Sequence, residues 1–129
     1  MGGSATVAAH AAGKLYFHHS CGLIRDLLAL YSQTRMDAVH AFTVPPIGNV
    51  TIAEGRPLLG DAIAIIAGVE ALSGPMDDHQ AVRGSVHRMV REAHSSGGVV
   101  LSVAGYPNRT IEQTQFVVDC CREVGGRQR

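Results

Sequence analysis

The sequence has no excess of charge of either sign. Eleven Lys and Arg residues balance eleven Asp and Glu residues, and only one of the eleven basic residues is a lysine. Proteins that bind nucleic acid or anionic lipid neutralise phosphates with a basic stripe, and the sequence contains no such stripe. We therefore expect neither a nucleic acid nor a membrane surface as a partner.

Long apolar runs are also missing. A helix that crosses a bilayer needs about 20 consecutive apolar residues, and no run in the sequence approaches this length. The first ten residues lack the charged segment and apolar block of a secretion signal. Cysteine is scarce, and three thiols, two of them adjacent at Cys120 and Cys121, do not make the disulfide framework of a small secreted protein. We expect a cytoplasmic protein whose thiols are reduced or bind a metal.

Charged residues are few for so small a protein. They make up 17% of the chain, and the mean hydropathy is slightly positive at +0.11. With so few charged residues to cover the surface, we expect part of the apolar surface to contact a partner. A chain of 129 residues has the length of one domain. We therefore expect a single domain over residues 1–129, with residues 125–129 as a frayed tail.

A short apolar run, a turn and a helical stretch follow one another four times along the chain. The expected strands cover residues 15–19, 38–43, 62–69 and 99–104, and the expected helices cover residues 23–33, 51–59, 77–94 and 110–123. Within residues 23–33, the side chains of Leu23, Leu27, Leu30 and Tyr31 fall on one helical face. The strand over residues 62–69 is apolar throughout, which is typical of a strand covered on both faces.

This alternation predicts an α/β protein of four parallel βα units. Right-handed crossovers would place the four strands side by side in one parallel sheet. Two architectures satisfy the pattern: an open doubly wound sheet, or half of a TIM-type (βα)8 barrel. In both of them, chemistry gathers at the carboxyl ends of the strands.

The carboxyl end of the first expected strand carries the most informative residues. His19 and Cys21 are two positions apart, so in an extended strand their side chains point the same way, and both are zinc-ligand types. The alternative is that His19 bonds a backbone carbonyl and Cys21 is a small buried apolar residue. Zinc needs three or four ligands, so the pair alone does not complete a site.

Other candidates are each open to two interpretations. Glu70, at the end of the apolar strand, is either an oxygen ligand or substrate anchor, or it caps the following turn. Tyr106, in the last loop, either binds substrate or belongs to a turn. His40 is either a core histidine or an inward-facing group below the site. His18 points away from His19, and Cys120 and Cys121 are expected to pack within the last helix.

Several segments together resemble a known family. The run Gly-Lys-Leu-Tyr-Phe-His-His-Ser-Cys-Gly over residues 13–22 is followed by a helix and by Met-Asp-Ala-Val at 36–39. Two further matching segments are Ala-Ile-Ile-Ala-Gly-Val-Glu at 64–70 and Gly-Gly-Val-Val-Leu-Ser at 97–102. In this order and spacing they resemble the carboxyl-terminal half of the uroporphyrinogen decarboxylase superfamily, over about residues 8–124.

This resemblance implies a (βα)8 barrel and a choice of chemistry. The superfamily contains heme-pathway decarboxylases and corrinoid-dependent methyltransferases, and the His-x-Cys-Gly motif is closer to the methyltransferase branch. The resemblance therefore implies that His19 and Cys21 bind zinc, which activates a thiol substrate, and that a partner protein carries the corrinoid. Glu70 stands where the family usually has an aspartate, which fits an oxygen ligand or a substrate anchor, and from its place in the last loop we also expect Tyr106 to contact substrate. The further cysteine ligand that the methyltransferases carry after the last barrel strand is not found at residues 102–107.

Half a barrel has two unpaired sheet edges and an uncovered interior face. Both are costly for an isolated monomer, so we expect a homodimer that completes the barrel. Two alternatives to the methyltransferase-type function remain open at this point. One is a decarboxylase-type domain that binds an anionic tetrapyrrole, and the other is a non-catalytic interaction module.

Overall fold

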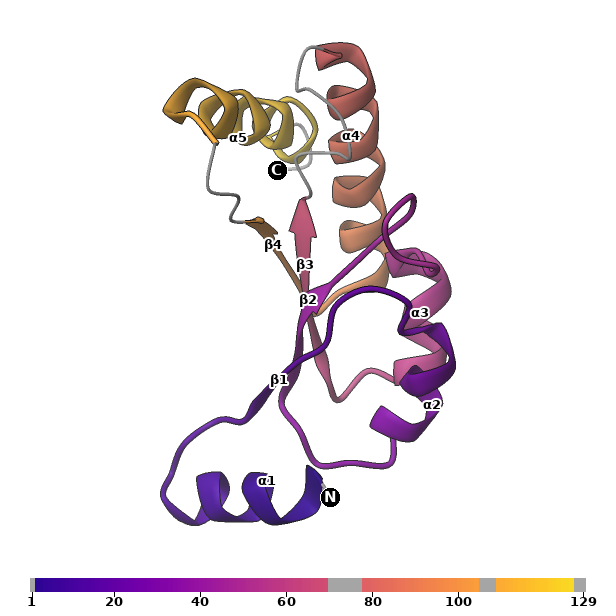
Figure 1. Ribbon diagram of the computed structural model, residues 1–129, viewed down its shortest axis with the longest axis vertical. Helices are drawn as coiled ribbons and strands as arrows, with labels where there is room; N and C mark the ends of the chain where they lie inside the picture. Colours follow the sequence, from indigo (N-terminus) through magenta and orange to yellow (C-terminus); the bar gives the residue numbers. More distant parts are fainter. Residues whose placement is uncertain (1, 70–77, 105–108, 127–129) are drawn as a thin grey trace.

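The fold was obtained as a computed structural model, which describes residues 2–69, 78–104 and 109–126. Its elements in chain order are α1 (Gly2–Ala11), β1 (Phe17–His19), the 3-10 turn η1 (Arg25–Leu27), α2 (Leu28–Tyr31), β2 (Ala38–Phe42), α3 (Ile52–Leu59), β3 (Ala64–Val69), α4 (His79–Ser96), β4 (Val99–Val103) and α5 (Ile111–Gly125) (Figure 1). The predicted alternation of strands and helices is confirmed. None of the described helices is both long and apolar enough to cross a bilayer.

The four strands form one parallel sheet in the order β1-β2-β3-β4. A doubly wound sheet reverses its strand order so that helices cover both faces, and the described strands show no reversal. With right-handed crossovers, a sequential order sends every connecting helix to the same face. In Figure 1, α2, α3 and α4 accordingly lie on one side of the strands.

Burial divides the sheet into two unlike faces. On the helix-covered face, Val39 and Ile65 are fully buried. On the opposite face, a row of register partners runs across all four strands and consists of His19, His40, Ile66 and Val100. Val100 is 56% exposed, and Phe17 on β1 is 51% exposed. We call this second face, which carries Phe17 and the row of four, the open face.

The expectation that β3 is covered on both faces is wrong for the described structure. Ile65 and Ala67 are fully buried, but Ala64 and Ile66 remain half-buried. The reason is the one-sided placement of the helices, which cover only the side on which Ile65 and Ala67 lie. An entirely apolar strand thus leaves part of its apolar surface on the open face.

A bulge in β2 changes which residues point to which face. The register runs from His40 opposite Ile66 directly to Phe42 opposite Ala67, so Ala41 has no partner on β3. Ala41 adopts a positive φ of 61°, a conformation uncommon for alanine. As a result His40 is exposed, while Phe42, only two residues later, is fully buried on the helix-covered side.

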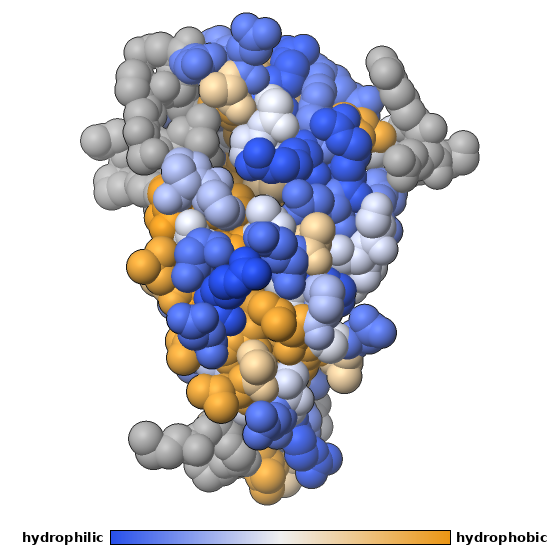
Figure 2. All heavy atoms as spheres, turned by 90° about the vertical axis from the view of Figure 1, so that its right-hand side faces the viewer, coloured by the Kyte–Doolittle hydropathy of each residue, from blue (hydrophilic) through white to orange (hydrophobic). Residues whose placement is uncertain are grey.

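The helix expected over residues 23–33 is shorter and differently oriented. A 3-10 turn precedes the four-residue α2, and Ile24 and Leu28 are buried in place of the predicted apolar face. Leu23 and Leu30 are 71% and 58% exposed. A 3-10 turn has three residues per turn, so it shifts side-chain directions relative to an α-helix. Figure 2 shows the side of the molecule on which α2, α3 and α4 lie, with hydrophobic residues at the surface among hydrophilic ones.

The other helix starts follow from capping residues. Thr51 and Thr110 accept hydrogen bonds from the backbone N–H groups of Glu54 and Gln113, whose side chains bond back to the two threonine N–H groups. These two capping boxes fix the starts of α3 and α5 within a residue of the prediction. Asp78 caps α4 in a simpler way, by accepting from the N–H of Ala81.

A buried arginine joins the loops at the amino ends of β3 and β4. Arg56 on α3 is only 7% exposed, and its guanidinium donates to four carbonyl oxygens, those of Gly60, Ile63, Gly97 and Gly98, at 2.8–3.1 Å. Burial lowers the pKa of Arg56, but its ordinary pKa is so high that the group stays charged. The carbonyl dipoles replace the water that this charge loses.

Candidate functional site

The end of β1 is oriented by contacts with Tyr31. The ring of His18 lies edge-on to the Tyr31 ring at 5.3 Å, and the hydroxyls of Ser20 and Tyr31 are hydrogen-bonded at 2.9 Å. Tyr31 belongs to α2, so His18 and Ser20 face the helices. The side chains of a strand alternate, which directs His19 to the open face, and Cys21, two residues beyond the end of β1, has an exposed side chain. The predicted opposite orientation of His18 and His19 is confirmed.

His19 is paired with His40 on the neighbouring strand. The two residues are direct register partners, and their Nδ1 atoms lie 3.0 Å apart. At this distance one Nδ1 carries a proton and donates a hydrogen bond to the other Nδ1. Both side chains are exposed, and their ring centroids are 5.1 Å apart. Of the two interpretations of His40, the core position is wrong: the side chain lies on the open face.

The loop that carries Cys21 is held by the loop that follows β2. The N–H of Gly22 donates to Thr43 Oγ1 at 3.2 Å, and the N–H of Arg25 donates to Asn49 Oδ1 at 3.1 Å. Gly48 lies so close to the chain that a Cβ there would be 1.8 Å from the carbonyl oxygen of Thr43. Only glycine therefore permits the tight turn of the loop after β2, and a Cβ there would also approach the carbonyl oxygen of Gly22 in the other loop to 3.2 Å.

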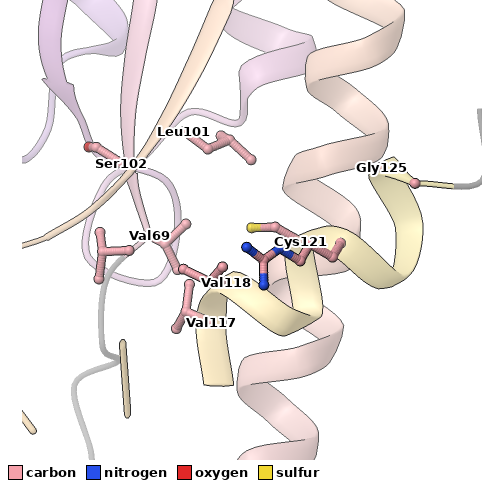
Figure 3. Close-up of a pocket in the computed structure, with 10 residues that line it drawn as sticks. Val69, Leu101, Ser102, Val117, Val118, Cys121 and Gly125 are labelled. Atoms are coloured by element: carbon pink, nitrogen blue, oxygen red, sulfur yellow. The ribbon is translucent and has the colours of Figure 1, made fainter. Parts of the chain in front are cut away.

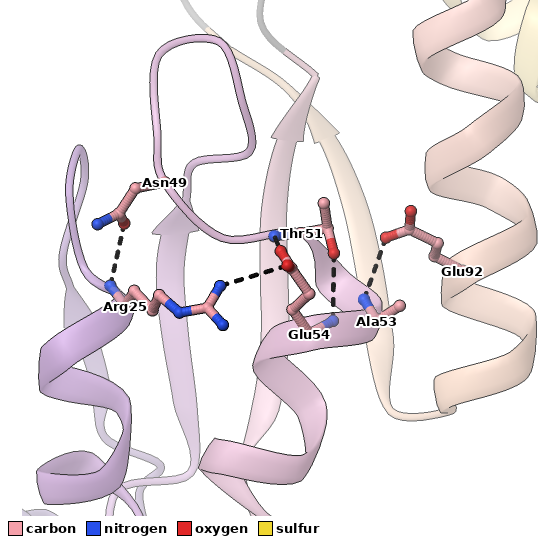
Figure 4. A network of polar contacts seen from close by, with 6 residues as sticks. All are labelled: Arg25, Asn49, Thr51, Ala53, Glu54 and Glu92. Atoms are coloured by element: carbon pink, nitrogen blue, oxygen red, sulfur yellow. Dashed lines mark hydrogen bonds and ion pairs between the residues drawn. The ribbon is translucent and has the colours of Figure 1, made fainter.

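Glu54 extends this anchoring from the loop to the helices (Figure 4). Its carboxylate accepts the N–H of Thr51 at 2.9 Å and pairs with the Arg25 guanidinium at 3.3 Å. The Thr51 N–H foremost, and then Arg25, hold the pKa of Glu54 below its ordinary value. On the other side of α3, Glu92 of α4 accepts the N–H of Ala53 at 3.1 Å. The start of α3 is thus tied to both neighbouring helices.

The predicted metal ligands lie together in part. His19 lies on the open face at the end of β1, and Cys21, two residues further on, has an exposed, free thiol. Within the described residues, no three His, Cys, Asp or Glu side chains are close enough to hold a metal ion in this conformation. Glu70 and Tyr106, predicted to contact substrate, lie outside the described residues.

A cavity of about 440 Å³ lies elsewhere, at the β4 edge of the sheet (Figure 3). Its walls are mainly apolar and come from the ends of β3 and β4 and from α5: Val69, Leu101, Ser102, Val103, Val117, Val118, Cys121, Arg122, Gly125 and Gly126. Burial raises the pKa of the Cys121 thiol and also that of fully buried Cys120. These two thiols are therefore protonated packing groups, as expected from the sequence.

Sequence reasoning did not identify the histidine pair. A signal was nevertheless present, because two parallel strands that each carry a histidine near the carboxyl end bring these residues together if the register matches. The register itself is not readable from the sequence.

Comparison with models of protein families, with curated proteins and with solved structures finds no match to this chain.

Proposed function

We propose that this chain is one half of a (βα)8 barrel of the uroporphyrinogen decarboxylase type and that it uses His19 and Cys21 to hold zinc for thiol activation. The observation that carries the proposal is that His19 and Cys21, two residues apart at the carboxyl end of β1, are both exposed, with His19 on the open face. This face would be the interior of the barrel, and the carboxyl end of the strands is where barrel enzymes place their chemistry.

The donor chemistry of this end of the sheet fits zinc. An imidazole nitrogen and a thiolate are the ligands that zinc prefers, and both side chains here are accessible from outside. Bound zinc would lower the pKa of a thiol substrate so that it reacts as a thiolate. The chain's own residues would position that thiol, and a corrinoid protein as partner would bring the methyl group to it.

We further propose that two copies close the barrel. In the described residues, β1 and β4 each have one unpaired edge, and the two edges run parallel. A two-fold axis along the barrel would place β4 of each copy beside β1 of the other, giving eight parallel strands with the helices outside. The same contact would cover the apolar cavity next to β4.

Light scattering during size-exclusion chromatography tests this assembly. We expect the mass of a dimer, about twice 13.6 kDa, at micromolar concentration. An aspartate in place of the exposed Val100 would put a charge inside the barrel and shift the mass towards the monomer. The control is Val7→Asp, which changes an equally exposed valine on α1. A monomer for the unchanged protein contradicts the two-copy barrel.

Metal analysis tests the proposed site. After zinc loading and gel filtration, we expect one zinc per chain in the unchanged protein and in Cys121→Ser, and none in Cys21→Ser. Retention of porphyrin without any metal would support the decarboxylase-type alternative. A chain that binds neither zinc nor porphyrin would be the non-catalytic interaction module, and the proposed function would be wrong.

A further inference from the structure

The His19–Cys21 pair leaves one ligand position without a protein group. A zinc ion in a catalytic site has three protein ligands and keeps one position for substrate. The resemblance to the methyltransferases supplies no residue for the third position, because the cysteine expected after the last strand is not found at residues 102–107. Glu70, which the sequence offers as an oxygen ligand, lies outside the described residues, so within the described part of the chain we look to the neighbouring strands of the same face.

His40 is the nearest candidate by position. It lies on β2, next to β1, and is the register partner of His19 on the open face. The row continues with Ile66 and Val100, which offer no ligand atoms. An imidazole at this point is therefore flanked by His19 on one side and by an apolar side chain on the other.

The distance between the two imidazoles suits a shared ion. Two nitrogens bound to one tetrahedral zinc at about 2.0–2.1 Å each lie about 3.3 Å apart. The Nδ1 atoms of His19 and His40 are 3.0 Å apart, so a slight separation of the rings is enough. In the metal-free pair one proton lies between these nitrogens, and a cation would take its place.

The backbone around His40 explains why its side chain is available. The bulge at Ala41 lets β2 bury Phe42 on the helix-covered side while His40 stays exposed on the open face. On β1, the contacts of Ser20 with Tyr31 hold the segment between His19 and Cys21 in place. Cys21 follows His19 by two residues and its thiol is exposed, and the site requires this side chain to turn towards the histidine pair, because no three ligand side chains of the described residues are close enough to hold an ion as they stand.

We infer that His40 is the third protein ligand of the ion and that it acts together with His19 and Cys21. The inference rests on the proposed function, which assigns only the latter two. It predicts a site of two nitrogens and one sulfur, built from two adjacent strands, with the remaining position open to a thiol substrate.

Cobalt(II) titration followed by absorption spectroscopy tests the assignment, with zinc competition to give affinities. A sulfur ligand produces a strong near-ultraviolet charge-transfer band, and a four-coordinate site gives intense visible bands. We expect both bands in the unchanged protein. His40→Ala should weaken zinc binding at least about 100-fold, since even the loss of an outer hydrogen-bond partner weakens metal sites about 10–100-fold. His94→Ala, an exposed histidine on α4, is the matched control, and circular dichroism verifies folding.

The outcomes separate the two proposals. If His19→Ala and Cys21→Ser abolish binding but His40→Ala binds as tightly as the control, His40 is not a ligand and the proposed function stands. If Cys21→Ser keeps full affinity and the unchanged protein lacks the charge-transfer band, the ion is held by histidines alone, and both proposals are wrong. If the unchanged protein binds no metal at micromolar concentration, both fail as well.

Discussion

The ring of Phe42 lies against Gly55, so that a Cβ on Gly55 would be 2.6 Å from the Cζ atom of that ring. Both residues are buried, with Phe42 on β2 and Gly55 in the middle of α3. Glycine in a helix interior normally costs stability relative to alanine. At this position it allows the helix to approach the sheet closely enough for Phe42 to fill the space between them.

Alanine substitutions at two helix glycines should therefore have opposite effects. Gly84, exposed in α4, has open space around it, so Gly84→Ala should stabilise the protein by about 0.5–1 kcal/mol. Gly55→Ala gains the same helix propensity but overpacks the core, and we expect a net loss of about 1 kcal/mol. Urea unfolding measures both. A smaller loss for Gly55→Ala in a Phe42→Leu background would identify the ring as the cause, and equal stabilisation by both alanines would contradict this packing.

Replacement of Arg56 by methionine should be among the most damaging single changes. Four carbonyl oxygens would lose a charged donor, and hydrogen bonds to charged groups contribute about 1.5–3 kcal/mol each. We expect a loss of at least about 3 kcal/mol, measured by thermal and urea unfolding. The same substitution at the exposed Arg88 on α4 is the control and should change little. Similar stabilities for the two variants would show that the four carbonyls do not depend on Arg56.

Stability should also depend on pH through Asp37. Its carboxylate accepts the N–H of Tyr16 at 2.7 Å and bonds His10 at 2.9 Å, and these contacts, the first foremost, lower the pKa of Asp37. A lowered pKa in the folded state contributes stability above the unfolded pKa of about 3.9, and this contribution is lost as pH falls through the folded value. The unchanged protein should thus exceed Asp37→Asn in stability at pH 7.

The difference between these two proteins should shrink from about pH 5 downwards as the carboxylate becomes protonated. Unfolding midpoints measured in urea between pH 7 and pH 3 test this. Asp26→Asn, an exposed aspartate in η1, controls for the loss of a surface carboxylate. A constant difference across the whole range would mean that the charge of Asp37 has no part in the effect.

The three thiols should react at different rates. Cys21 is exposed, Cys121 is half-buried, and Cys120 is fully buried. Burial raises the pKa of both Cys120 and Cys121, which leaves less thiolate to react. With Ellman's reagent at pH 7.5, we expect one fast thiol per chain, which is lost in Cys21→Ser, and two more on unfolding in urea. Fast reaction of more than one thiol in the folded protein would contradict the packing of α5.

The elements that the sequence predicts well are those with a local cause. Thr51 and Thr110 begin helices because their hydroxyls bond backbone N–H groups only three residues away. The face of the helix after β1 is not predictable in this way. Tertiary packing selects Ile24 and Leu28, and a 3-10 turn shifts the phase that a regular helix would give Leu23.

The features of the candidate site also divide into those with a local cause in the sequence and those that depend on distant contacts. Alternation along a strand is local, so the opposite directions of His18 and His19 are predictable. The meeting of His19 with His40 depends on the register of two strands, which depends on contacts distant in sequence. Alanine also gives no sign of a bulge at Ala41, since a left-handed residue is usually glycine or asparagine.

Ala41 therefore adds to the length of β2 without adding a pair to the sheet. The residue separates two stretches of opposite phase, one that directs His40 outwards and one that directs Phe42 inwards. Replacement by glycine would leave this arrangement intact. Deletion of Ala41 would put the two stretches in one continuous alternation, which still directs His40 outwards and Phe42 inwards. Natural variation at this position should thus accept the loss of one codon as well as changes of side chain.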